Sequence, residues 1–257
     1  MISEHERYDV FSEHADFLSR IMEAEQHASR LLPFIPRGLP VFQSHGILHS
    51  LAIIRIIHRI IQSPDIDLTL PEIFLLYMAA WFHDIGYLHP LTIQNRGVHP
   101  AISAEMIQQD PDIRSLITAE EFPILDTIIR YHDSHTDLTM IQETQSSVRS
   151  SLLAALFRLA DAVDLGTDRC PPEVFTLIKD GLDEHSRRHW QAHQNVRGIV
   201  ITYPVITILV QDPENQSFQR RIVTHLNDDC ESCNQILKRY GMGPIILEYK
   251  KSNQEIF

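Results

Sequence analysis

The chain has 257 residues, of which 44% are hydrophobic, so it can bury one large core and perhaps a small appended unit. Its formal charge of −12 argues against a nonspecific nucleic-acid surface, but it allows a small anionic substrate if a metal ion supplies positive charge locally. The polar, acidic start and the lack of any apolar run of ~18 residues predict a soluble, cytoplasmic protein without a secretory signal or membrane span.

The first part of the sequence predicts one helix after another. Residues 7–31 have the spaced apolar positions of an amphipathic helix, which the Pro/Gly-rich stretch 33–40 ends. Ser44 is predicted to cap a helix over residues 45–62. Pro71 suits the first turn of the apolar helix 71–84, which Gly86 is predicted to end. A loop over 88–97 then leads to a helix over 99–109.

Helical patterns continue over residues 120–135, 147–166, 171–180 and 183–193. At about residue 196 the pattern changes, and the β-branched, alternating stretch 196–211 predicts two short strands around a Tyr-Pro break. A helix over 220–241, closed by Gly241, and a last strand over 244–250 follow. We therefore predict a mainly α protein, with an all-helical domain over 1–195 and a small α+β unit over 196–257. The small unit suits packing or dimerisation better than a second catalytic domain.

Three cysteines do not make a disulfide framework in a chain of this size. Cys230 and Cys233 form a single CxxC motif, and the second ligand pair of a structural zinc site is missing. We interpret them as two thiols on a polar helix rather than as a zinc or redox site.

Histidine is abundant, with 15 in the chain, and several histidines fall at helix ends or on apolar faces together with aspartates. The candidates are His49, His83, Asp84, His99, His132 and Asp161. Asp161 lies in the apolar stretch LFRLADAVD, and a carboxylate is almost never fully buried unless it is paired or bound to a metal. Imidazole and carboxylate ligands without thiolate suit Mn, Fe, Co, Ni or Zn better than Mg or Ca.

These ligands divide naturally between two ions. His49, His83, Asp84 and Asp161 can hold one divalent transition-metal ion, while His99 and His132 can hold a second one, with Asp84 bridging the two. Neighbouring helical residues point ~100° apart, which is poor for chelating a single ion. The adjacency of His83 and Asp84 is reasonable if the carboxylate reaches between two ions. We expect one or two bound metal ions.

The order H…HD…H…H…D, with each element on a helix, resembles the HD-domain superfamily of metal-dependent phosphohydrolases over roughly residues 40–170. The resemblance implies a helical HD-domain bundle. It also implies that His49, His83, Asp84 and Asp161 bind the primary metal, and that His99 and His132 bind a second metal or phosphate.

Two subfamilies of that superfamily match poorly. HD-GYP cyclic-dinucleotide phosphodiesterases carry a lysine after HDIG and a double histidine before a GYP signature, where this chain has Tyr87 and YHDSHTDL. Guanosine-tetraphosphate hydrolases carry HDxxED, where this chain has HDIGYL.

The resemblance implies metal-dependent hydrolysis of a phosphoester or phosphoanhydride by a metal-activated hydroxide. Asp84, His99, His132 and Arg158 are the predicted catalytic residues. Arg158 precedes Asp161 by three residues and is therefore predicted to hold that carboxylate in place on the same helical face. Further candidates for substrate contact or proton transfer are Arg55, Arg96, Arg130, His135, His189 and His193.

Two other functions use the same residues. A di-iron oxygenase related to inositol oxygenase shares the ligand set, and a metal-stabilised module that binds a nucleotide without turnover would signal through the 196–257 unit. The expected partner is a small phosphorylated substrate, with nucleotides among the candidates. No extended nucleic-acid surface and no membrane contact are expected. Assembly into a homo-oligomer is left open.

Overall fold

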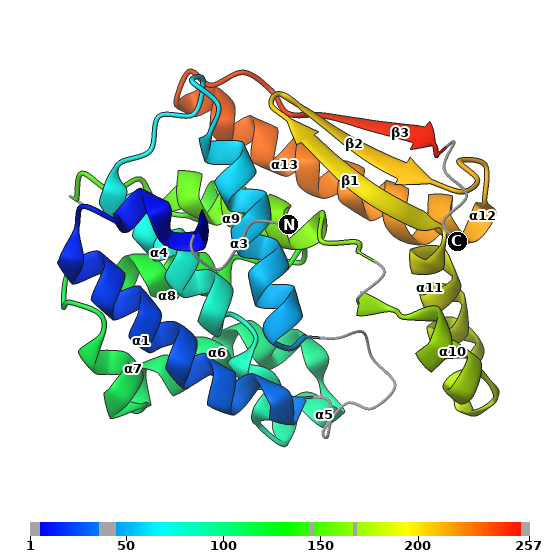
Figure 1. Cartoon of the computed structure of the whole chain (residues 1–257), viewed down its shortest axis with the longest axis horizontal. Coiled ribbons are helices and arrows are strands. Elements are labelled where there is room, and N and C mark those ends of the chain that lie inside the picture. Colours follow the sequence, from blue (N-terminus) through cyan, green and yellow to red (C-terminus); the bar gives the residue numbers. More distant parts are fainter. Residues whose placement is uncertain (1–5, 36–44, 144–145, 167–168, 253–257) are drawn as a thin grey trace.

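The apolar helical patterns fold into a bundle, and a small sheet lies along one side of it (Figure 1). The computed structural model describes residues 6–35, 45–143, 146–166 and 169–252. The predicted mainly α fold with a small C-terminal α+β unit is confirmed. The helices of the first part are η1 (Glu6–Phe11), α1 (Ala15–Leu31), η2 (Leu32–Phe34), α3 (Ile47–Ile61), α4 (Leu70–Phe82), η3 (Ile85–Leu88), α5 (Leu91–Gln94), η4 (Arg96–Val98), α6 (His99–Gln109), α7 (Pro111–Ser115), α8 (Phe122–Arg130), η5 (Leu138–Met140), α9 (Ser150–Ala162), α10 (Pro172–Ile178), η7 (Lys179–Gly181) and α11 (Glu184–Gln194).

Helix α4 is the centre of the bundle. Its residues 74–82 are fully buried, and helices α1, α3, α8 and α9 pack around it. A helix that is apolar on all sides must be covered on all sides, which explains its composition. Its start is fixed by Pro71 in the first turn and by a capping box between Thr69 and Glu72. Because α4 runs through the core, it delivers the two residues at its end, His83 and Asp84, into the interior.

Several predicted boundaries differ from the structure. The predicted helix 7–31 is divided into η1 and α1, and the predicted loop 88–97 contains α5 and η4. Ser44 lies outside the described residues, and Gly46 occupies the N-cap position of α3. The helix predicted over 120–135 ends at Arg130, so His132 lies in the turn that follows it.

The prediction that Gly86 ends the central helix was wrong. Helix α4 ends at Phe82, and Gly86 lies inside the next helical turn, η3. A Cβ at this position would lie 2.3 Å from the carbonyl oxygen of His99 and 2.7 Å from Oγ of Ser103. Glycine is required here because α6 approaches the backbone closely. This close approach brings the start of α6, and with it His99, next to Asp84.

The C-terminal unit forms a three-stranded sheet with one long helix. Strand β1 (Val196–Thr202) pairs antiparallel with β2 (Val205–Val210), which pairs in parallel with β3 (Ile246–Lys251). Between β2 and β3 the chain forms α12 (Gln216–Phe218), a π-helical turn η8 (Gln219–Val223) and α13 (Thr224–Arg239). The hairpin, the helix and the last strand were all predicted.

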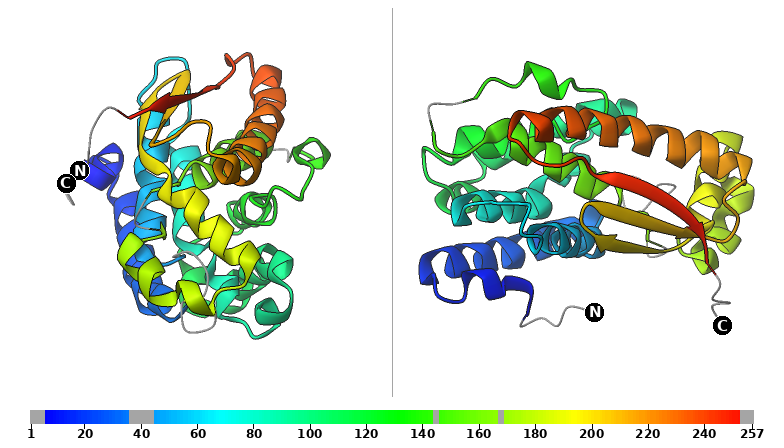
Figure 2. Two further views of the ribbon diagram at one scale, coloured as in Figure 1. Left: turned by 90° about the vertical axis from the view of Figure 1, so that its right-hand side faces the viewer. Right: turned by 90° about the horizontal axis from the view of Figure 1, so that it is seen from above.

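Helix α13 packs against α9, as the views of Figure 2 also show. Cys233 is buried in this contact, and its thiol donates a hydrogen bond to the carbonyl oxygen of Ala155 on α9 (3.0 Å). Cys230 is also buried, with its thiol directed at the carbonyl oxygen of Ile245 (3.5 Å). Both thiols thus face the interior rather than the polar side of the helix. The apolar side chains of the unit join the bundle core, and a division into two domains at residue 196 stays a prediction.

None of the helices in the described ranges has the length and apolar character needed to cross a membrane.

Candidate metal centre

Six predicted residues from five segments of the bundle meet at one point. His49 lies in the first turn of α3, His83 and Asp84 follow α4, His99 begins α6, His132 follows α8, and Asp161 lies in the last turn of α9. Three overlapping groups of side chains can each hold a metal ion, because their ligand atoms lie within 4.8 Å of one another. The groups are His45, His49 and Asp84; His49, His83 and Asp161; and His83, Asp84 and His132. His99 joins them through its Nε2 atom, 2.9 Å from Nε2 of His132.

The two carboxylate oxygens of Asp84 face different histidines. Oδ2 lies 3.2 Å from Nε2 of His83 and 3.5 Å from Nε2 of His49. Oδ1 lies 3.5 Å from Nε2 of His99 and 4.0 Å from Nε2 of His132. One carboxylate therefore stands between two sets of imidazoles, which is the arrangement of a bridging ligand.

Asp161 completes the first of these sets. Its Oδ1 atom lies 3.1 Å from Nε2 of His49 and 4.0 Å from Nε2 of His83. The Asp161 side chain is 23% exposed, whereas the Asp84 side chain is 4% exposed. Asp161 thus forms the edge of the cluster that faces the cavity described below.

The outer ring nitrogens of three histidines are held by backbone carbonyls. Nδ1 of His83 faces the carbonyl oxygen of Ala79 (3.2 Å), and Nδ1 of His132 faces that of Ile129 (2.6 Å). Nδ1 of His99 likewise faces the carbonyl oxygen of Arg96 (2.8 Å). A carbonyl oxygen only accepts, so these Nδ1 atoms carry the proton.

In the neutral rings the Nε2 atoms then point their lone pairs into the cluster. His99 and His132 place two such atoms 2.9 Å apart, and the Nε2 atom of His83 points at Nε2 of His49, 3.2 Å away. Lone pairs at this distance repel each other unless a cation or a proton lies between them. The donor set therefore fits a divalent cation, and imidazole with carboxylate is the ligand chemistry of first-row transition metals.

The electrostatics of the cluster also favour a positive charge. Burial and Arg169 act to lower the pKa of His49, but hydrogen bonds to Asp161 and Asp164 outweigh them and raise it to about 9. Burial would raise the pKa of Asp84, yet the surrounding His83 and His45 hold it well below its usual value. The carboxylates therefore stay ionised inside the protein.

His99 and His132 are held in the neutral form that binds metals. Burial, together with His132, lowers the pKa of His99 to about 4. Burial and His83 lower the pKa of His132. A neutral imidazole offers its Nε2 lone pair at neutral pH without first losing a proton.

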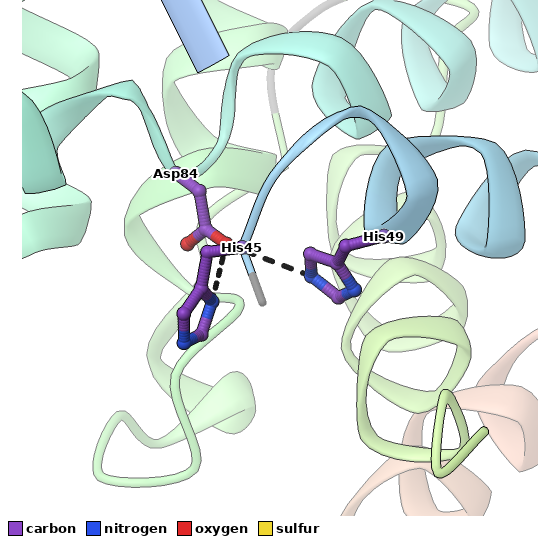
Figure 3. Close-up of side chains that lie close together, drawn as sticks. All are labelled: His45, His49 and Asp84. Carbon is purple, nitrogen blue, oxygen red and sulfur yellow. Dashed lines mark hydrogen bonds and ion pairs between the residues drawn. The ribbon is translucent and has the colours of Figure 1, made fainter. Parts of the chain in front are cut away.

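The sequence analysis missed two members of the site, His45 and Asp164. His45 precedes α3, and its Nδ1 atom lies 2.8 Å from Oδ2 of Asp84 (Figure 3). Asp164 comes just after α9 and accepts a hydrogen bond from Nδ1 of His49 (2.7 Å). The sequence held a signal for each, since His45 is four residues before His49 and Asp164 is three residues after Asp161.

A cavity of about 310 Å³ opens beside the cluster. Asp84, His99, His132 and Asp161 line its inner end. The C-terminal unit also lines the cavity, through Arg221, Ile222, His225, Leu226 and Asp229. The unit predicted to serve packing or dimerisation rather than as a second catalytic domain therefore also lines the cavity.

The other sequence candidates lie at different places. Arg158 lines the cavity, but the hydrogen bond predicted between Arg158 and Asp161 is replaced by bonds that its guanidinium donates to the carbonyl oxygens of Tyr131 and Thr136. Arg158 lies one turn before Asp161 on α9, but its long side chain reaches the carbonyl oxygens of the turn after α8 and is held there. Its catalytic role stays a prediction.

Two of the candidates for substrate contact or proton transfer, His135 and His193, line the cavity. The other candidates of this group are not among its lining residues. Arg130 pairs with Asp126 on its own helix, and Arg55 lines a second cavity of about 490 Å³ between α3 and β1.

The model of the HD-CE family matches residues 32–229, which include all six predicted ligands and the first part of the C-terminal unit. The chain belongs to the HD-CE family. The family name indicates an HD-type domain, in agreement with the His83–Asp84 pair at the centre of the cluster. A search of curated proteins found no match.

Proposed function

We propose that the protein is a metal-dependent phosphohydrolase of the HD superfamily, outside its HD-GYP and HDxxED subfamilies, acting on a phosphoester or phosphoanhydride of a small molecule such as a nucleotide. The single observation that carries the proposal is the position of Asp84, whose two carboxylate oxygens face two separate sets of imidazole nitrogens. A bound pair of divalent cations supplies Lewis-acid polarisation of a phosphoryl oxygen and makes hydroxide available at neutral pH.

The protein's own residues would hold this site rigid. His49, His83, Asp84 and Asp161 are the proposed ligands of one ion, and His99 and His132 those of the second. The Nδ1 contacts to Asp164 and to the carbonyls of Ala79, Arg96 and Ile129 fix the ring orientations. Ser103 supports the turn that follows α4, because its hydroxyl donates to the carbonyl oxygen of His83 and accepts from the amide of Gly86.

Groups that line the cavity next to the cluster would orient the substrate. Tyr87 stacks on His99 with ring centroids 4.1 Å apart, and burial raises the pKa of its hydroxyl above the usual range, so the hydroxyl stays a neutral donor. Arg169 lies with Nη2 3.3 Å from Nδ1 of His45 and also lines the cavity. A guanidinium at this position would bind a phosphoryl oxygen.

The test combines elemental analysis of the purified protein with a screen of phosphorylated small molecules in the presence of Mn²⁺, Co²⁺ or Ni²⁺. We expect phosphate release that is abolished by Asp84→Asn, with metal content measured in both proteins. Asp16→Asn, which removes a carboxylate from the exposed start of α1, is the matched control.

Three results would contradict the proposal. Full phosphatase activity of metal-loaded Asp84→Asn would show that the cluster around Asp84 is not the active site. Bound iron with oxygen uptake and without phosphate release would favour the oxygenase. Tight nucleotide binding without turnover under every metal would favour a signalling module.

A further inference from the structure

The cavity extends beyond the metal cluster to a wall that the C-terminal unit provides. Arg221, His225 and Asp229 are spaced four residues apart over η8 and α13, and all three line the cavity. Residues at this spacing share one face of a helix, so one face of the C-terminal helix runs along the cavity. Helix α13 is held there by its packing against α9, which carries Asp161 (Figure 2).

The two ends of this helix face differ in charge. Burial raises the pKa of Asp229, and the nearby charges of Arg158, Asp161, Asp133 and Asp228 also act on this pKa. Asp229 therefore lies at the acidic end of the helix face, beside the metal cluster. Arg221 lies at the other end, with Nη1 3.4 Å from the ring nitrogens of His185. Arg221 and Asp229 are eight residues apart, which is ~12 Å along a helix. A molecule that fills the cavity therefore meets the metal cluster at one end and cationic groups at the other.

Basic side chains from separate segments line this side of the cavity. Arg221 belongs to η8 and His193 to α11, while Arg169, which precedes α10 and contacts His45, lies between His193 and the metal cluster. Burial, followed by Arg169, Arg221 and Arg96, lowers the pKa of the neighbouring His189 to about 4. In a chain with a net charge of −12, this gathering of arginines creates a local positive potential.

His193 provides an independent sign that a ligand belongs there. Its side chain is 4% exposed, and among the described residues its Nδ1 atom has no hydrogen-bond partner. Buried polar atoms are nearly always hydrogen-bonded, and an orphan nitrogen in a cavity wall is satisfied when a ligand atom binds it. Burial, His189 and Arg169 hold the pKa of His193 well below its usual value, so the ring is neutral and has one N–H with which it can donate to an anion.

We propose that His193 and Arg221 form a second anion-binding subsite, so that the substrate is a small molecule with two phosphate groups. One phosphate group lies at the metal cluster and the other at this subsite. The proposal rests on the proposed function and names its substrate class. It assigns to the C-terminal unit a role in substrate choice.

The probes are alkanediol bisphosphates of increasing chain length, each compared with the alkyl monophosphate of the same length. Binding to the purified full-length protein is measured by titration calorimetry, and hydrolysis is measured separately by phosphate release. We expect bisphosphates of one range of lengths to bind at least tenfold more tightly than their monophosphates, as the loss of a charge-assisted hydrogen bond to phosphate is worth about that factor.

Arg221→Met removes the charge and keeps the apolar stem, and it should abolish most of this tenfold preference. Arg220→Met is the matched control, because Arg220 is the exposed neighbour that does not line the cavity. Arg221→Lys should retain part of the preference. His193→Phe keeps a buried ring without its nitrogens and should reduce the preference too, which provides a second test if Arg221→Met fails to fold.

The outcomes separate the two proposals. If no length of bisphosphate binds better than its monophosphate, or if Arg221→Met and Arg220→Met behave alike, the subsite is overturned while phosphohydrolase activity can stand. If the preference exists and depends on Arg221 but nothing is hydrolysed, the subsite stands and the proposed function falls.

Discussion

Asp164 accepts a hydrogen bond of 2.7 Å from Nδ1 of His49, and both side chains are buried. The bond fixes which nitrogen of the ring points outward, so that Nε2 faces Asp161 and Asp84. A carboxylate behind a metal-binding imidazole orients the ring and makes it a stronger ligand. Asp164 is therefore part of the site although it is not in any of the three ligand groups.

Asp164→Asn should weaken divalent metal binding by about 10- to 100-fold, because the amide oxygen is a poorer acceptor for the His49 ring. The measurement is a metal titration of chelator-treated protein, followed by calorimetry or metal analysis. Asp16→Asn serves as the control at an exposed carboxylate. Unchanged metal affinity in Asp164→Asn would show that His49 is not a ligand or that its orientation is set elsewhere.

His132→Ala should lower the occupancy of one metal ion more than that of the other. His132 lies on the Oδ1 side of Asp84, whereas Asp161 and His49 lie on the Oδ2 side. Metal-to-protein ratios measured at increasing metal concentration should therefore approach about half of the wild-type value. An equal loss of both ions would show that the ligands are divided wrongly between the two positions.

Gly86→Ala should destabilise the fold and distort the site. The added Cβ would meet the carbonyl oxygen of His99 at 2.3 Å, so α6 would have to move away from η3. Overpacking of this kind costs ~1–3 kcal/mol of unfolding free energy, which urea unfolding measures. Gly243→Ala is the matched control, because its Cβ would meet nothing within 4 Å. Equal stability of the two variants would contradict the close packing described for Gly86.

Asp229→Asn should stabilise the metal-free protein at neutral pH but not in acid. Burial, only partly offset by Arg158, raises the pKa of Asp229 from 3.8 to about 6, and Asp161, Asp133 and Asp228 add to the rise. The folded state thus holds a proton that the unfolded state releases, so this group makes stability fall as the pH rises from about 4 to about 6.

The asparagine removes this dependence on pH. The gain in unfolding free energy should reach at most ~3 kcal/mol above pH 6 and vanish near pH 4. Each unit of difference between the folded-state and unfolded-state pKa is worth ~1.4 kcal/mol. Thermal unfolding of chelator-treated wild type and variant at several pH values measures it. A gain that stays the same at pH 4 and at pH 7.5 would show that the titration of Asp229 is not its cause.

The sequence by itself determined the helical bundle and identified six residues of the cluster. Each of them has a local signal, because a histidine or aspartate at the end of an apolar helix cannot remain there without a partner. The sequence also placed the change from helix to strand at Val196, where the apolar period changes from helical spacing to alternation.

Tertiary structure decided what depends on contacts between distant segments. Arg158 could be placed on the face of Asp161 by counting, but only the fold shows that its guanidinium bonds the turn after α8. The sequence predicted that Gly86 ends a helix, whereas the structure shows that a glycine is required there because α6 brings the carbonyl oxygen of His99 close to it. The packing of α13 on α9, which brings Arg221 to the cavity, likewise joins distant segments, since Cys233 and Ala155 in this contact are 78 residues apart. The spacing of hydrophobic residues predicts which face of a helix is buried, but not which other helix covers that face. The choice of the covering helix determines which residues line a cavity together.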